Sequence, residues 1–189
     1  MKIRNVAATA AFAALTVTGT AFAADKMMAE NPMVGGAPMS ASRDIVTNAV
    51  ASNDNKTLVA AVKAAGLVST LQGPGPFTVF APTDEAFAGL PAGTVDTLVK
   101  PENKATLTKI LTYHVVPGKL DFAALQSKIQ AGGGKASLTT VQGEPITVAM
   151  NGPRNITITD SKGNVAQITT YDVYQSNGVI HTIDKVLTP

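Results

Sequence analysis

The spacing of apolar residues along the chain changes near Ala136. Before it, apolar residues recur every three or four positions, which lines one face of a helix; after it they alternate, as in strands. Helices followed by antiparallel strands indicate an α+β fold with one sheet system. No internal repeat is visible in the sequence, so we expect a single domain.

Helix starts are indicated by residues that suit a first turn. Ser42, Thr83 and Asp121 are expected N-caps, and Pro101 suits a first helical position. Gly66 follows the apolar face of the second helix and suits a left-handed cap. The sequence predicts helices near residues 42–50, 55–66, 83–90, 94–99, 101–111 and 121–129.

The sequence predicts two strands between these helices and further strands after them. Phe77–Ala81 is rich in β-branched and aromatic residues and ends at Pro82. Tyr113–Val116 is a second β-like run, closed by Pro117 and Gly118. The alternating part predicts strands near residues 138–141, 146–150, 155–159, 165–173 and 179–187.

Residues 1–23 have the three-part pattern of a cleavable signal peptide. Lys2 and Arg4 form a positive start, residues 6–17 are almost wholly apolar, and small residues surround Ala23. The apolar run is too short for a membrane-spanning helix, which needs about 20 apolar residues. We expect cleavage after Ala23 and export; a buried N-terminal helix is the alternative.

Residues 24–41 are rich in methionine, proline and glycine, which is typical of a linker ahead of a domain at residues 42–189. Exported methionine-rich segments can bind copper(I) through their thioethers. A copper-binding segment is therefore the alternative to a plain linker. The methionines concerned are Met27, Met28, Met33 and Met39.

The charge balance and the cysteine content of the sequence exclude several classes of function. Cleavage takes away Lys2 and Arg4 and leaves 13 basic and 13 acidic residues. The pI of about 8.9 therefore belongs to the precursor, and no nucleic-acid partner is indicated. The absence of cysteine excludes disulfides, thiolate catalysis and a lipid anchor on an N-terminal cysteine. After cleavage, no apolar stretch is long enough to span a membrane.

Common catalytic and metal-binding patterns do not occur in the sequence. The two histidines, His114 and His181, lie far apart and fit no metal-ligand spacing. There is no G-x-S-x-G nucleophile elbow and no phosphate-binding glycine loop. The adjacent acids Asp84 and Glu85 suit the first turn of a helix. We therefore expect a binding protein and assign no catalytic residue, cofactor or metal site.

Three ordered segments carry the most specific signal. They are Phe77–Phe87 (FTVFAPTDEAF), Ile110–Gly118 (ILTYHVVPG) and Asn177–Leu187 (NGVIHTIDKVL). In order and spacing they resemble the two characteristic boxes of the fasciclin family with its Tyr-His segment between them. Met33–Met39 also resembles a lead-in of bacterial members, so the likeness covers roughly residues 31–189.

This resemblance implies both a fold and a role. The implied fold is a fasciclin-like β-sandwich wedge with several short helices packed along it. The implied role is adhesion or matrix-type interaction outside the cytoplasm. In animal members the Tyr-His segment has been tied to receptor binding, which makes Tyr113 and His114 the candidate binding residues here.

The residues themselves also support a structural interpretation of this segment. If it is a strand, Tyr113 and His114 point to opposite faces, and one of them is buried. A buried polar ring needs a hydrogen-bond partner. We therefore expect His114 to make a hydrogen bond that fixes the position of the strand after the preceding helix. We rank this role ahead of a binding contact, and a binding contact ahead of catalysis. His181 is expected to be a structural or surface residue, and Asp184 to be structural.

Two functions follow from these considerations. The first is an exported interaction module for cell-surface or matrix adhesion through contacts with a protein or matrix partner at the cell envelope. The alternative, which the resemblance implies because some fasciclin-like proteins are associated with lipid or pigment ligands, is an extracytoplasmic carrier of an apolar small molecule. A helix-covered sandwich can open an apolar cleft for such a ligand. Either protein would be periplasmic or secreted.

The signal-peptide hypothesis predicts the first residue of the exported protein. We expect Ala24, because cleavage follows the small residues that end at Ala23. N-terminal sequencing of protein recovered outside the cytoplasm checks this expectation. Recovery of a chain that still begins with Met1 would contradict export by this route.

Overall fold

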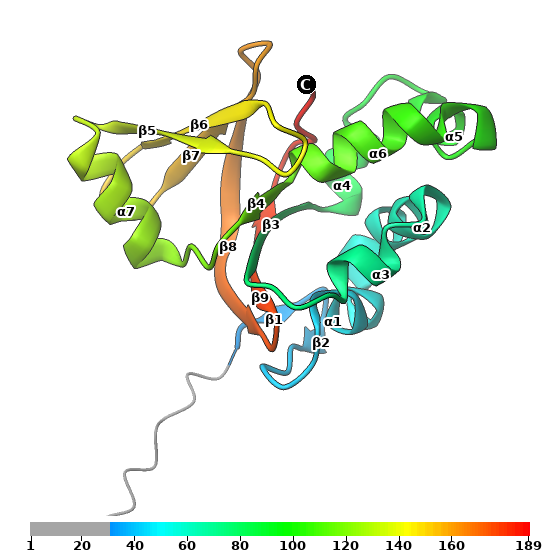
Figure 1. Cartoon of the computed structure of the whole chain (residues 1–189), viewed down its shortest axis with the longest axis horizontal. Coiled ribbons are helices and arrows are strands. Elements are labelled where there is room, and N and C mark those ends of the chain that lie inside the picture. The colour runs from blue at the N-terminus through cyan, green and yellow to red at the C-terminus, as the bar shows by residue number, and fades with distance from the viewer. Residues whose placement is uncertain (1–30) are drawn as a thin grey trace, which may run out of the picture.

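A seven-stranded sheet forms the centre of the protein in the computed structural model, which describes residues 31–189 (Figure 1). The strands are β3 (Phe77–Pro82), β4 (Val115–Pro117), β5 (Lys135–Thr139), β6 (Pro145–Met150), β7 (Ile156–Thr159), β8 (Val165–Gln175) and β9 (Gly178–Ile183). Their order in the sheet is β4-β3-β9-β8-β7-β6-β5. Neighbouring strands are antiparallel, except that β3 and β9 are parallel.

Short helices pack along this sheet. They are α1 (Ile45–Ala51), η1 (Asn53–Asn55), α2 (Lys56–Ala65), α3 (Val68–Leu71), α4 (Asp84–Ala88), α5 (Thr94–Leu98), η2 (Pro101–Asn103), α6 (Lys104–Tyr113) and α7 (Phe122–Ala131). In Figure 1, α1 to α6 gather on one side of the molecule, and α7 lies on the other side, against β5 and β6.

The sheet separates two apolar cores, as the alternation within β3 shows. Val79 and Ala81 face the core that the sheet shares with helices such as α2 and α6. Phe80, between them, faces a second core, to which α7 contributes Leu125 and Ile129. Each strand face therefore has its own apolar partner.

The sheet also folds over the second core. The long strand β8 pairs with β7 through its first residues and with β9 through its later ones. The two edges of the sheet meet where the Val141 N–H donates to the Val115 carbonyl at 2.7 Å. This arrangement confirms the expected α+β class, with several short helices along a sandwich-like sheet.

The helix caps follow the sequence in most places. Thr83 and Asp121 are N-caps, and Gly66 ends α2 at φ 74°, in the left-handed region. The predicted cap Ser42 is wrong, because Asp44 accepts the Thr47 N–H at 2.9 Å instead. The carboxylate of Asp44 also accepts the Thr47 hydroxyl, which gives it two partners in that turn.

The prediction that Tyr113 and His114 lie in a strand is wrong. Tyr113 is the last residue of α6, His114 is its C-cap, and β4 begins only at Val115. Helical geometry places His114 over Ile110, four residues earlier. Both rings are therefore buried, with exposed fractions of 0% for Tyr113 and 2% for His114.

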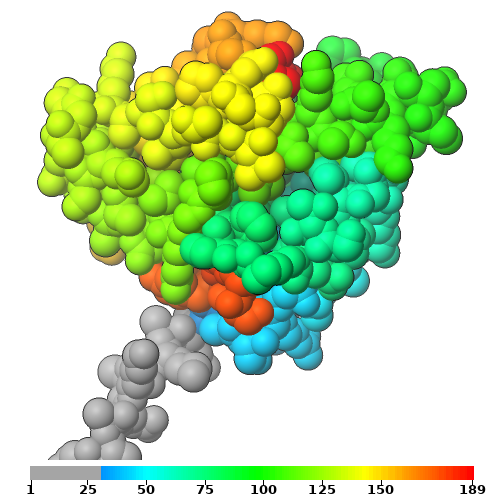
Figure 2. Space-filling view, in the orientation of Figure 1, coloured from blue at the N-terminus to red at the C-terminus, as the bar shows by residue number. Residues whose placement is uncertain are grey.

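Part of the expected linker is folded. Strands β1 (Met33–Val34) and β2 (Ala37–Pro38) form an antiparallel hairpin. Val34 and Met39 are buried in the helix-side core, whereas Met33 is 64% exposed. Figure 2 shows these first described residues in blue, packed beside the β8–β9 turn. Met27 and Met28, of the copper hypothesis, lie outside the described residues.

Within residues 31–189, no helix combines the length and the apolar character that crossing a bilayer requires.

Candidate functional site

The hydroxyl of Tyr113 joins two turns that are distant in sequence. It donates to the Pro145 carbonyl at 3.0 Å and accepts the Ser161 N–H at 2.9 Å. Pro145 opens β6, and Ser161 follows β7. Burial raises the pKa of Tyr113, so the phenol stays protonated and keeps its donor role.

The ring of His114 also makes two hydrogen bonds to the backbone. Its Nδ1–H donates to the Ile110 carbonyl at 2.8 Å, and its Nε2 accepts the Leu187 N–H at 2.9 Å. An acceptor Nε2 requires the neutral ring. Burial agrees with this state, because it lowers the pKa of His114 to about 4.

These four bonds hold the walls of a surface groove of about 300 Å³. Ile110 belongs to the α6 wall, Pro145 follows the β5–β6 turn, Ser161 adjoins the β7–β8 turn, and Leu187 precedes the C-terminal wall. The groove is lined by Thr106, Lys109, Ile110, Gln142, Glu144, Lys162, Thr188 and Pro189. Tyr113 and His114 lie beneath this groove and shape it without reaching its surface.

Asp160 is a residue of this region that the sequence reasoning missed. Its carboxylate accepts the N–H groups of Lys162, Asn164 and Thr188 at 2.8–3.1 Å. Burial opposes its ionisation, but hydrogen bonds from Asn164 and Thr188 outweigh burial and keep the pKa of Asp160 below its usual value. The available signal was an aspartate between the predicted strands 155–159 and 165–173, because aspartate favours turns.

His181 is buried as well, within the interior strand β9. Its Nε2–H donates to the Leu120 carbonyl at 2.7 Å, and its Nδ1 accepts the Asp172 N–H at 3.3 Å. Phe80 stacks on the ring, with 5.8 Å between the ring centroids. Burial lowers the pKa of His181. The expected structural role of His181 therefore agrees with its contacts.

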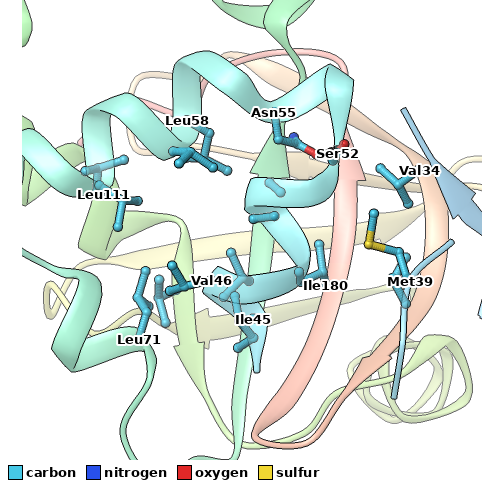
Figure 3. Close-up of a pocket in the computed structure, with 17 residues that line it drawn as sticks. Val34, Met39, Ile45, Val46, Ser52, Asn55, Leu58, Leu71, Leu111 and Ile180 are labelled. Atoms are coloured by element: carbon cyan, nitrogen blue, oxygen red, sulfur yellow. Dashed lines mark hydrogen bonds between the residues drawn. The ribbon is translucent and has the colours of Figure 1, made fainter. Parts of the chain in front are cut away.

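An apolar cavity of about 40 Å³ lies between α1, α2 and the strands β3, β8 and β9 (Figure 3). Ser52 and Asn55 are its polar lining residues, and the Ser52 hydroxyl donates to Asn55 Oδ1 at 3.0 Å. The Asn55 amide donates in turn to the Pro82 carbonyl at 3.1 Å. The cavity therefore offers aliphatic side chains and no free charged or polar group.

Metal-ligating side chains do not gather in the part of the chain that the structure describes. No group of three or more histidine, aspartate, glutamate or cysteine residues there is placed to hold a metal ion. Met39, one of the four methionines of the copper hypothesis, packs in the apolar core instead.

The comparison with protein families decides the identity of the domain. The family model described as the fasciclin domain matches residues 53–189.

The chain belongs to the fasciclin domain family. The match includes the three segments whose order and spacing suggested this family.

Individual relatives support the same assignment over the whole fold. The Synechocystis protein sll1483 is 44% identical over 192 aligned positions, which cover 99% of both chains. The cell surface glycolipoprotein MPB83 of Mycobacterium bovis is 35% identical over 167 positions, covering 85% of this chain and 68% of the relative.

A solved structure confirms the fasciclin fold. The domain pair from the insect cell adhesion molecule Fasciclin I superposes with a TM-score of 0.68 at 17% identity. The match covers 78% of this chain and 51% of that structure. This likeness extends to the fold of one domain.

The contacts of His114 generate a stability prediction. We expect His114→Ala to lower the free energy of unfolding by about 1–3 kcal/mol, because buried Ile110 and Leu187 backbone groups lose their partner. Urea unfolding of the mature protein measures this loss. Unchanged stability combined with lost partner binding would instead make His114 a direct contact residue.

The neutral state of His114 generates a pH prediction. Its pKa is about 4 in the folded chain and about 6.5 when unfolded, so its contribution is complete above pH 6.5 and is lost toward pH 4. The full loss corresponds to about 3 kcal/mol. Urea unfolding at several pH values measures it.

His114→Gln is the control for this pH dependence. The glutamine amide keeps a donor and an acceptor but does not titrate in this range. The variant should show a shallower dependence of stability on pH between 4 and 6.5. His181 remains and continues to contribute in the same direction. An unchanged slope would contradict the assigned state of His114.

Proposed function

We propose that this fasciclin-domain protein is an exported interaction module that contacts a protein or matrix partner at the cell envelope. The observation that carries the proposal is the groove above Tyr113 and His114, whose walls depend on these two buried residues. In this proposal the Tyr-His segment supports binding by shaping the groove, and the partner contacts the exposed residues around it.

The relatives support a location outside the cytoplasm. One relative is a cell surface glycolipoprotein, and the matched domain pair comes from a cell adhesion molecule. We propose the same kind of location, periplasmic or secreted, for this chain. The signal-peptide pattern of residues 1–23 supports this proposal independently of the fold.

The state of the two histidines supports binding over catalysis. His114 and His181 are the only histidines of the sequence, and both rings are buried with both nitrogens hydrogen-bonded to backbone groups. A general base needs a ring nitrogen within reach of a substrate proton. Neither ring offers one in this fold, so we propose no enzymatic role.

The groove has a mixed chemical character that suits a polar partner with an apolar anchor. Lys109 and Lys162 supply positive charges, Glu144 supplies a negative one, and half-buried Ile110 adds an apolar surface. Charged groups at the edge of an interface set orientation and specificity. We propose that the two lysines orient the partner over the groove.

Paired lysine variants test this function. We expect Lys109→Ala/Lys162→Ala to weaken binding of the labelled mature protein to envelopes of its native host by about tenfold, or about 1.4 kcal/mol. Binding isotherms at fixed ionic strength measure the change. The matched control is Lys128→Ala/Lys135→Ala, which removes the same charge from exposed positions outside the groove.

The comparison between the two double variants decides the outcome. Weaker binding of the groove variant alone supports the groove as the contact surface. Equal weakening of both variants would indicate attraction by overall charge, and full binding by both would exclude the two lysines as contacts.

A second candidate function, an extracytoplasmic carrier of an apolar small molecule, is favoured by the cavity of about 40 Å³. Its lining binds no water strongly, because Ser52 and Asn55 already bond each other and Pro82. The proposed cargo is therefore uncharged and mainly apolar. Binding of an uncharged fluorescent probe tests this candidate.

A further inference from the structure

Residues 31–40 form a strap that is fastened to the domain at both ends. At one end, the Asn31 amide donates to the Tyr174 carbonyl at 2.6 Å and accepts the Tyr174 N–H at 2.9 Å. At the other end, the buried Asn48 amide makes the same pair of bonds with Ser40, at 2.7 and 3.1 Å. Each end therefore depends on a single side-chain amide.

Between these ends, the backbone of the strap contacts the backbone of residues 53–54 at Gly35. The Gly35 carbonyl accepts the Asn53 N–H at 3.3 Å, and its φ is +58°. A Cβ at this position would lie 2.5 Å from the Asp54 nitrogen and 2.6 Å from the Asn53 nitrogen. The close approach of the two backbones thus requires glycine here.

The underside of the strap is a wall of the apolar cavity. Val34 and Met39 project from the strap into the cavity lining, and Figure 3 shows them beside each other at one end of it. Both are 7% exposed. The opposite end is formed by Leu71 and Leu111, from α3 and α6.

The strap differs from the other walls in how it is held. Helices, sheet strands and the junction of α1 with η1 at Ser52 hold the remaining lining residues, whereas the strap is a hairpin with two residues in each strand. Val34 and Met39 are the only buried residues of the strap, and a segment with so few buried side chains opens at lower free energy than core elements. The strap is therefore the wall that can move without unfolding the sheet.

The cavity is too small to admit a ligand unless one of its walls moves. A cavity of roughly 150 Å³ holds benzene, whereas this one measures about 40 Å³. A molecule as large as benzene enters only when part of the lining moves away. Displacing Val34 and Met39 together removes two side chains from the same end of the cavity.

We propose that the strap is the gate of an apolar ligand site and admits small uncharged apolar molecules between α1, α2 and the sheet. This inference rests on the second candidate function and specifies how its cargo enters. Val34 and Met39 set the size of molecule that fits, and Asn31, Gly35 and Asn48 keep the gate closed.

Two neighbouring glycines provide a matched test of the gate. Gly35→Ala should displace the strap, because its Cβ collides with backbone atoms. Gly36→Ala introduces a side chain at a similar positive φ of 72°, but no atom lies within 4 Å of its Cβ. The two variants therefore share the backbone strain and differ in the collision.

The probe is N-phenyl-1-naphthylamine, an uncharged molecule that fluoresces in apolar surroundings. Stopped-flow mixing with the mature protein measures its rate of uptake. We expect uptake about tenfold faster in Gly35→Ala than in Gly36→Ala, because the open fraction limits uptake. Asn31→Ala, which releases one end of the strap without touching the cavity, should also accelerate uptake.

The outcomes separate the gate from the carrier function. Faster uptake in Gly35→Ala and Asn31→Ala, with Gly36→Ala close to the unmodified protein, supports the gate. Equal uptake rates in all four proteins would overturn the gate and leave the carrier function standing. No probe fluorescence in any folded variant, with folding checked by circular dichroism, would overturn both.

Discussion

His114 has to remain neutral, because its Nε2 accepts the Leu187 N–H while its Nδ1–H donates to the Ile110 carbonyl. A charged ring would carry a proton on Nε2, so Nε2 could no longer accept the hydrogen bond from the Leu187 N–H. This requirement joins helix α6 to the end of the chain in one buried contact. Tyr113 extends it, since its hydroxyl holds Pro145 and Ser161. Four backbone segments, at Ile110, Pro145, Ser161 and Leu187, therefore meet at two adjacent rings.

The two proposed binding sites lie in different parts of the molecule. Val79 and Ala81 face the helices and line the apolar cavity, whereas Phe80 faces the second core. The groove lies at the α6 end of the molecule and takes its walls from α6, two turns and the chain end. The strap that borders the cavity lies beside the β8–β9 turn instead (Figure 2). Helix α6 contributes to both sites, Lys109 and Ile110 to the groove and Leu111 to the cavity, whereas the other lining residues come from different segments.

Local signals predicted much of this fold, and long-range contacts explain where prediction failed. The spacing of apolar residues and helix caps such as Thr83 and Gly66 could be predicted, because these signals act within one helical turn. Tyr113 and His114 were misplaced in a strand because burial against Leu187, distant in sequence, favours one more helical turn than local composition does. Asn31 gave no signal at all, since its partner Tyr174 is 143 residues away. The cavity could not be predicted from the sequence either. Apolar spacing predicts which face of a helix or strand is buried, but not how tightly that face packs.

The place of β9 determines when the domain can fold. It is the last strand of the chain, yet it lies between β3 and β8, and all six of its residues are buried. Without β9, the sheet falls into two fragments, β4-β3 and β8-β7-β6-β5, which share no ladder. Pairing of β3 with β9 also closes a long loop, which is slow. A chain that emerges N-terminus first therefore cannot complete the sheet until β9 arrives. In the export proposed for this chain, this strand order postpones completion of the sheet until β9 has crossed the membrane.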